Sequence, residues 1–365
     1  MNILVLSSYN DAWNSVRPEA EIFIALAKAG HNVTILTQED AAYVQRFKAN
    51  GITVIDHYPK RKICLKTIKY LRALFAKQPI DIVYAMNSRT IANAAFACIG
   101  FDSIKLVTYR GTVGGVYRLD PSAYLTHLHP RVDGIACVSN AVEKDLKTRV
   151  WRIKDKVTTV YKGHDIAWYQ TKPACRERLH IPEDAFCVIC IANTRPSKGV
   201  AYLLESAKQL RGLNRLHLLL VGRNMDTEAH KQLANDSGMV ERIHFLGYRD
   251  DVPALIAASN VQVQPSISGE GLPKTFVEAM AMAIPSIVTT TGGAKEFIDE
   301  AQSGFVVPTR DSYAISEKIK FLYKRPEQCQ TMGNLAQAKM IKDLSSQKSA
   351  SDLLSFFQYL MQASS

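Results

Sequence analysis

The fold is decided by an apolar run and the polar turn after it, Phe186-Cys187-Val188-Ile189-Cys190-Ile191 and then Ala192-Asn193-Thr194-Arg195-Pro196-Ser197-Lys198-Gly199. A short unbroken apolar run of this kind is typical of a strand that is buried on both faces of a parallel sheet. Similar runs alternate with helix-length amphipathic segments before this stretch, and the alternation starts again with it. The sequence therefore predicts an α/β fold with two successive doubly wound, Rossmann-like domains.

The predicted strands can be placed by residue number. In the first half they span residues 3–6, 33–36, 53–55, 82–85, 106–109, 134–138 and 157–160. In the second half they span residues 187–191, 216–221, 243–245, 261–264, 286–288 and 304–307. The expected domains are 1–166 and 167–345, joined near residues 163–183, with a C-terminal helix in 346–365 that packs back on the first domain. Ligands of such open sheets bind beyond the carboxyl ends of the strands.

The composition is that of a soluble globular protein, with 47% hydrophobic and 22% charged residues in a chain of 365. No apolar run reaches the 18 or so residues that span a bilayer, and the first apolar run stops at Ser7, too early for a signal peptide. Seven scattered cysteines predict no disulfide framework. The expected compartment is the cytoplasm. Positive charge is uneven, +9 over residues 1–166 and +2 over residues 167–365.

The most informative local pattern is Ser268-Gly269-Glu270-Gly271-Leu272-Pro273-Lys274-Thr275-Phe276-Val277-Glu278-Ala279-Met280. Glu270 follows a predicted strand, and Pro273 is suited to the first turn of a helix. The free N–H groups and dipole of that turn form an anion site fit for a diphosphate, and Glu278 could accept paired hydrogen bonds from a ribose diol. From the pattern alone, a solvated loop acid at Glu270 and a surface helix residue at Glu278 stay open.

This segment resembles the Glu-x7-Glu segment of the retaining glycosyltransferase family 4, whose members have the two-domain GT-B fold. The resemblance covers nearly the whole chain. Further segments similar to family landmarks are residues 138–142, 162–165, 221–222, 245–248, 264–266 and 291–296. The resemblance implies a first domain that binds the acceptor and a second that binds a nucleotide sugar.

The resemblance also implies roles for residues of the donor site. Glu270 contacts the donor sugar, Glu278 contacts the ribose, and the base packs near Tyr248 and Arg249. The other donor-binding residues that it implies are Gly271, Leu272 and Asn193.

Two cations follow the first strand of the second half. Arg195 and Lys198 can neutralise a leaving diphosphate, an interaction that strengthens as charge develops; alternatively both lie on a solvated loop. The family holds its arginine five residues before the lysine, where this chain has Asn193. The catalytic set implied is therefore Glu270 and Lys198, with Arg195 as a substitute for the family arginine.

The first domain departs from the family pattern in two loops. Where the family often has a Gly-Gly loop, this chain has residues 7–17, and its polar residues Asn14 and Arg17 are the expected acceptor contacts. Arg110 stands where the family commonly has histidine, and a guanidinium clamps an anion but cannot accept a proton. Arg110 and Gly111 are expected to face the acceptor, with a structural ion pair of Arg110 as the alternative.

Residues 58–77 contain seven basic residues and no acid. An amphipathic helix over Lys60 to Lys77, with Lys62, Lys66 and Lys69 beside an apolar stripe, would suit an anionic membrane surface. Ordinary core packing with a solvated basic face is the alternative. Nucleic acid is not an expected partner, because no interleaved aromatics and no nucleic-acid module occur.

The function implied is a retaining glycosyltransferase of cell-surface polysaccharide or lipopolysaccharide synthesis, peripheral on the inner face of the membrane. Its donor is a nucleoside-diphosphate sugar and its acceptor a glycan or lipid-linked glycan. No cofactor and no metal are expected, since the sequence has no Asp-x-Asp motif. The alternatives are an epimerase or hydrolase of the same fold and a non-catalytic glycan-binding module. A dehydrogenase is disfavoured because no G-x-G-x-x-G follows Leu6.

Overall fold

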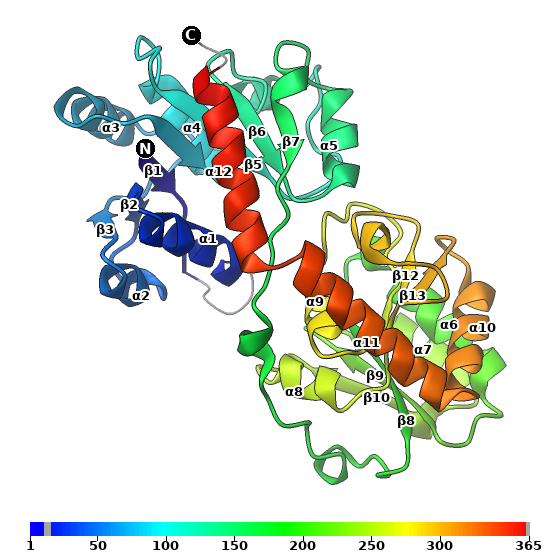
Figure 1. The fold of residues 1–365 in the computed structure, drawn as a ribbon. Coiled ribbons are helices and arrows are strands. Elements are labelled where there is room, and N and C mark those ends of the chain that lie inside the picture. The colour runs from blue at the N-terminus through cyan, green and yellow to red at the C-terminus, as the bar shows by residue number, and fades with distance from the viewer. Residues whose placement is uncertain (11–15, 363–365) are drawn as a thin grey trace. The chain divides into compact units, whose positions relative to one another are not determined.

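A computed structural model describes residues 1–10 and 16–362. The chain forms two compact units (Figure 1). The first consists of Met1–Gly163 with Ser345–Ser365, and the second of His164–Leu344. These divisions lie within three residues of the expected boundaries after residues 166 and 345.

The first unit contains a seven-stranded parallel sheet in the order β3-β2-β1-β4-β5-β6-β7. Its strands are β1 (Asn2–Leu6), β2 (Asn32–Thr37), β3 (Thr53–Asp56), β4 (Ile82–Ala85), β5 (Lys105–Arg110), β6 (Gly134–Cys137) and β7 (Val157–Thr159). The order reverses between β1 and β4, which pair directly. This reversal is the switch point, where doubly wound sheets open a crevice for ligands.

The second unit repeats the arrangement with a six-stranded parallel sheet in the order β10-β9-β8-β11-β12-β13. Its strands are β8 (Phe186–Ile191), β9 (Leu216–Val221), β10 (Ile243–Gly247), β11 (Val261–Gln264), β12 (Ser286–Thr289) and β13 (Gly304–Val307). Here the switch point lies between β8 and β11. The predicted doubly wound fold is confirmed, and every predicted strand lies within two residues of its place.

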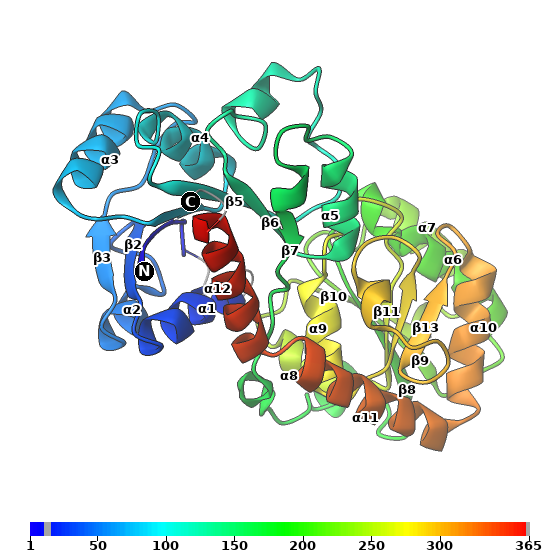
Figure 2. The same cartoon turned by 45° about the horizontal axis from the view of Figure 1, so that its top comes forward.

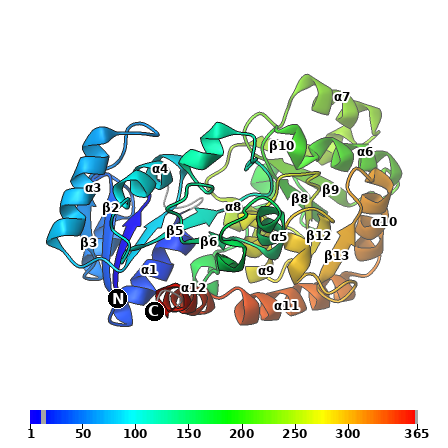
Figure 3. The same ribbon diagram turned by 90° about the horizontal axis from the view of Figure 1, so that it is seen from above.

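Helices cover both faces of each sheet. In the first unit they are α1 (Arg17–Lys28), α2 (Val44–Ala49), α3 (Leu65–Lys77), α4 (Ser88–Ala97), α5 (Asn140–Lys147) and α12 (Ser346–Gln362). In the second unit they are α6 (Val200–Leu210), α7 (Glu228–Asp236), α8 (Val252–Ala257), α9 (Lys274–Ala281), α10 (Ser312–Tyr323) and α11 (Pro326–Asp343). Figure 3 shows α3 and α4 on one face of the first sheet with α1 and α12 on the other, and α6 opposite α9 in the second unit.

The C-terminal helix completes the core of the first unit. Helix α12 lies beside α1 (Figure 2), and the ring of Tyr84 on β4 is 5.4 Å from that of Phe23 and 5.7 Å from that of Phe357. A Cβ atom at Gly134 would lie 2.7 Å from a methyl carbon of Leu360. Helix α12 begins at Ser346, the first residue of the segment expected to be helical, and Ser349 in its first turn accepts a hydrogen bond from the N–H of Gly163 at 2.8 Å.

The basic helix of the first unit is shorter than the sequence pattern predicted. Helix α3 begins at Leu65, so the expectation of a helix from Lys60 is wrong and Lys62 lies outside it. The cause is Asn93 on α4, whose side chain donates to the carbonyls of Arg61 and Lys62 at 3.1 Å and accepts from the N–H of Cys64 at 2.8 Å. These bonds hold the preceding segment in a loop. No helix in residues 1–10 and 16–362 has the length and apolar character to cross a bilayer.

Candidate active site

The candidate site lies in the second unit, where the loops after β8 and β11 meet at the switch point. The N–H of Ile267 donates to the carbonyl of Ser197 at 2.8 Å and ties the two loops together. At Gly199, where φ is +64°, a Cβ atom would lie 2.1 Å from the carbonyl oxygen of Pro265. Only glycine tolerates both this positive φ and this close contact. The loop that carries Lys198 is therefore fixed against the loop that leads to Glu270.

Glu270 is a buried, partnered carboxylate. It is 8% exposed, and its Oε1 accepts from the Lys198 ammonium at 2.6 Å and from the Ser266 hydroxyl at 2.7 Å. Gln264 in turn donates to Ser266 at 2.9 Å. This chain of hydrogen bonds fixes the carboxylate in position and excludes the solvated loop acid that the sequence pattern left open.

The loop after β12 supports the turn that contains Glu270. Gly292 has φ +74°, and a Cβ atom there would lie 2.5 Å from the Cβ of Glu270. The N–H of Gly293 donates to the carbonyl of Gly271 at 2.5 Å. Gly222, after β9, approaches so closely that a Cβ atom would lie 1.7 Å from the carbonyl oxygen of Ala192. Four strand ends are thus interlocked through positions where no side chain fits.

Glu278 is almost completely buried, on α9. It is 2% exposed, its Oε1 accepts from the Lys274 ammonium at 2.6 Å, and its Oε2 has no hydrogen-bond partner among the described residues. Burial raises the pKa of Glu278, and the Lys274 ammonium opposes part of that rise. A buried acceptor without a partner is costly, which makes Oε2 a ready acceptor for a ligand hydroxyl and rules out a surface helix residue.

The other residues predicted to bind the donor differ in their exposure and in their hydrogen-bond partners. Asn193 accepts from the N–H of Arg195 at 3.1 Å and shapes the turn, while the Arg195 side chain is exposed and forms no ion pair with a described residue. Tyr248 is 51% exposed, with the Arg223 guanidinium 4.6 Å from its ring centre. Arg249 is engaged by Asp251, to which it donates twice, at 2.8 and 2.7 Å. Leu272 lies in the glycine turn between Glu270 and α9.

In the first unit, Arg110 organises its own loop. Its guanidinium donates to the carbonyl of Thr112 at 3.0 Å and to that of Gly114. The N–H of Gly114 donates to Asp145 at 2.8 Å, so both the N–H and the carbonyl of Gly114 are held. Burial lowers the pKa of Arg110, with Asp145 opposing the shift. Arg110 thus binds backbone carbonyls and forms no ion pair with a described residue, while its contact with an acceptor stays a prediction.

The structure describes two of the three other residues that were predicted to contact the acceptor. Gly111 follows Arg110, and a Cβ atom there would meet the Tyr109 ring at 3.1 Å. Arg17 is the first residue of α1. Asn14 lies outside the described residues.

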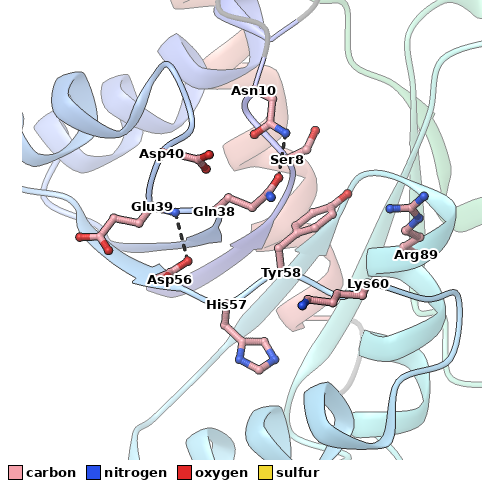
Figure 4. A pocket seen from close by; sticks show the side chains of 10 residues that line it. All are labelled: Ser8, Asn10, Gln38, Glu39, Asp40, Asp56, His57, Tyr58, Lys60 and Arg89. Atoms are coloured by element: carbon pink, nitrogen blue, oxygen red, sulfur yellow. Dashed lines mark hydrogen bonds between the residues drawn. The ribbon is translucent and has the colours of Figure 1, made fainter.

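Sequence reasoning missed a cavity of about 710 Å³ at the carboxyl edge of the first sheet. It is lined by Ser8, Asn10, Gln38, Glu39, Asp40, Asp56, His57, Tyr58, Lys60 and Arg89 (Figure 4). A signal was present, because polar residues follow the predicted strands 33–36 and 53–55 directly.

A buried ion pair near the end of β1 was also missed. The Lys162 ammonium lies 3.1 Å from Glu19 and 4.2 Å from the centre of the Tyr109 ring. The second oxygen of Glu19 and the hydroxyl of Tyr9 are buried without hydrogen-bond partners among the described residues. Burial, with Glu19 nearby, raises the pKa of Tyr9.

Two doubly wound parallel sheets, the second with an ion-paired acid at its switch point and a buried carboxylate on α9, match the GT-B fold of glycosyltransferases. Comparison with known proteins agrees. The model "Glycosyl transferases group 1" matches residues 171–339, and "Glycosyltransferase Family 4" matches residues 20–168. The chain belongs to glycosyltransferase family 4.

Relatives of this chain span different shares of it. N-acetyl-alpha-D-glucosaminyl L-malate synthase of Bacillus anthracis is 26% identical over 88% of each chain. UDP-Gal:alpha-D-GlcNAc-diphosphoundecaprenol alpha-1,3-galactosyltransferase of Escherichia coli is 25% identical over 68% of this chain and 67% of its own. Putative glycosyltransferase EpsD of Bacillus subtilis is 31% identical over 43% of this chain, which spans only 42% of that relative.

A solved structure shows the same fold. Anabaena HepE in complex with UDP aligns with a TM-score of 0.79 and 19% identity, over 98% of this chain and all of that one.

Proposed function

We propose that this protein is a retaining glycosyltransferase that moves a sugar from a nucleoside-diphosphate sugar to a glycan or lipid-linked acceptor. The observation that carries the proposal is the pairing of Glu270 with Lys198 at the switch point, with the unpartnered oxygen of buried Glu278 on the adjoining helix. A binding module has no need of a cation placed beside a leaving group, whereas a transferase does.

The proposed donor geometry assigns one task to each side chain. Lys198 exchanges its contact with Glu270 for the diphosphate, and exposed Arg195 adds a second charge as the sugar-phosphate bond breaks. Glu270, released from Lys198 but still held by Ser266, then faces the donor sugar. Glu278 accepts the ribose hydroxyls. The UDP complex of the structural relative HepE supports a nucleoside diphosphate as the ligand.

The acceptor attacks from the face that the diphosphate leaves, so the donor phosphate itself takes the acceptor proton. No side-chain base is required by this route. Because Lys198 and Arg195 supply positive charge to the diphosphate, we propose that transfer is independent of a metal ion.

The acceptor is proposed to be a cell-surface glycan precursor presented at a membrane. The name of one relative gives a diphosphoundecaprenol-linked acceptor. In this chain the apolar residues of α3 differ in exposure. Leu71 and Phe75 are buried, whereas Leu65 is 71% exposed. Lys66 and Lys69 lie exposed beside it. An exposed apolar residue flanked by lysines matches an anionic bilayer in both polarity and charge.

A thermal-shift screen against UDP-, GDP-, ADP- and CMP-sugars tests the donor assignment. A ligand at 100 times its dissociation constant stabilises by about 2.7 kcal/mol, so one base should stand out, and Glu278→Ala should lose most of that shift. Incubation of the selected donor with and without a membrane lipid extract then separates the functions. Transfer to the extract supports the proposal; release or epimerisation of the sugar without acceptor contradicts it, and so does binding without any turnover.

A further inference from the structure

The cavity of the first unit lies at that unit's own switch point. Ser8 follows β1, His57 follows β3, and Arg89 lies in the first turn of α4, directly after β4. The chain leaves β1 toward α1 on one face of the sheet and leaves β4 toward α4 on the other (Figure 3). This divergence opens the sheet edge, and a volume of about 710 Å³ falls within the usual range of ligand pockets.

The charges of the cavity are separated by sign. Glu39, Asp40 and Asp56 lie on one side in Figure 4, and Lys60 and Arg89 lie on the other. Neither cation forms an ion pair with any described residue, although three carboxylates line the same cavity. The opposite charges therefore lie beyond ion-pair distance of one another, and a ligand between them can contact both.

Four polar side chains of the cavity are held by hydrogen bonds, those of Asn10, Gln38, Asp56 and His57. Asp56 accepts the N–H of Glu39 at 3.1 Å, and the side chains of Asn10 and Gln38 are joined at 2.7 Å. His57 is bonded to Thr67 of α3 at 3.0 Å and stacks on Tyr70 with ring centres 4.4 Å apart. Such preorganisation reduces the entropy lost when a ligand binds.

We propose that this cavity binds a sugar that carries a phosphate or diphosphate on its anomeric carbon. The sugar hydroxyls donate to Asp40 and Asp56, and the phosphate oxygens accept from Lys60 and Arg89. The acids disfavour an anion that has no hydroxyl groups, and the cations add affinity that a neutral sugar does not gain. The inference rests on the proposed function, because it names the acceptor's end as a glycosyl phosphate.

Two sources share this chemistry, a soluble sugar phosphate and a lipid-linked one. His57, which lines the cavity, contacts α3 through Thr67 and Tyr70. Lys60 belongs to the basic segment that leads into that helix. A headgroup held at a bilayer against α3 is therefore near the cavity within the same unit.

Saturation-transfer NMR on the full chain tests the cavity, with the donor site filled by the nucleoside diphosphate found in the thermal screen. The probes are glucose, galactose and N-acetylglucosamine 1-phosphates, each matched with its neutral methyl glycoside. At least one sugar phosphate should bind about tenfold or more tightly than its methyl glycoside. A second arm offers the same sugar as a polyprenyl diphosphate in anionic vesicles; binding in that arm alone identifies the lipid-linked source.

Variants assign the binding to the cavity. Lys60→Gln and Arg89→Gln should each weaken binding of the sugar phosphate about tenfold and leave binding of the methyl glycoside unchanged. Asp56→Asn should weaken binding of both. Lys28→Gln, an exposed lysine of α1, is the matched control and should change neither. Absence of binding in both arms, or binding that Lys60→Gln and Arg89→Gln do not affect, overturns the proposal. Nucleotide binding that persists in those samples shows that the donor assignment stands apart from this failure.

Discussion

The two units share a strand order but differ in how their switch points are built. Between β8 and β11, four loops are interlocked by glycines and converge on an ion pair between the buried Glu270 and the half-buried Lys198, 2.6 Å apart. Between β1 and β4, the equivalent edge is an open cavity whose cations are unpaired among the described residues. The common topology determines where a ligand can bind, and the side chains at the strand ends determine which ligand it is. Under the proposed function, the fixed cation of the second unit suits a diphosphate, and the open cavity of the first suits an acceptor.

The largest expected effect is on stability. It concerns the ion pair between Lys162 and Glu19 in the first unit, which has a structural role in this account. Lys162→Met leaves Glu19, only 4% exposed, charged without a partner. We expect a loss of about 3–5 kcal/mol, as for other broken buried pairs. Chemical denaturation measures it. The more exposed pair Lys147–Glu143 is the matched control, and Lys147→Met should lose less than about 1 kcal/mol. Equal losses would remove the structural role of Lys162.

The catalytic contrast comes next. Glu270→Gln should fold and bind nucleotide but transfer sugar roughly a hundredfold or more slowly, because a preorganised charged contact of the transition state is lost. Steady-state turnover with the selected donor measures this. Glu317→Gln, an exposed acid of α10, serves as control and should retain full turnover. Normal turnover by Glu270→Gln would exclude the second unit's switch point as the catalytic site.

A smaller effect concerns pH. Because burial raises the pKa of Glu278, the carboxylate protonates on acidification sooner than an exposed glutamate does. Its hydrogen bonds to the ribose weaken when the charge is lost, so nucleotide affinity should fall by roughly fivefold as the pH drops through the raised pKa. Titration calorimetry at several pH values follows this, and Glu278→Gln should bind weakly with a flat profile. A wild-type affinity that rises on acidification would contradict the assignment.

The smallest effect is at the membrane. Lys66→Gln with Lys69→Gln should weaken binding to anionic vesicles by on the order of 1 kcal/mol for each lysine, and less at higher salt. The melting temperature should hardly change, because both side chains are exposed. Co-sedimentation at two salt concentrations measures this, with Lys28→Gln as control. Negligible binding by the parent protein would return α3 to the core-packing alternative.

How much the sequence could predict depended on how far apart along the chain the interacting residues are. Strand positions and the set of Glu270, Glu278 and Lys198 follow from short patterns and the family resemblance; the structure pairs Glu270 with Lys198 and buries Glu278 on α9. The start of α3 depends on Asn93, 29 residues beyond Cys64, and the ion pair of Glu19 joins residues 143 positions apart. No local pattern encodes such contacts. Arg110 differs, because its partners are nearby carbonyls of its own loop and only the conformation of that loop brings them to the guanidinium.

The division of labour between the units is tested most directly by calorimetric titration of the selected nucleoside diphosphate into three proteins: wild type, Glu278→Ala and Arg89→Gln. The account predicts that Glu278→Ala weakens binding by about 1–3 kcal/mol, the range for a lost hydrogen bond to a charged group. Arg89→Gln should leave the nucleotide affinity unchanged, because its cavity belongs to the other unit. Weakening by Arg89→Gln with no effect of Glu278→Ala would place the nucleotide in the first unit and contradict the account.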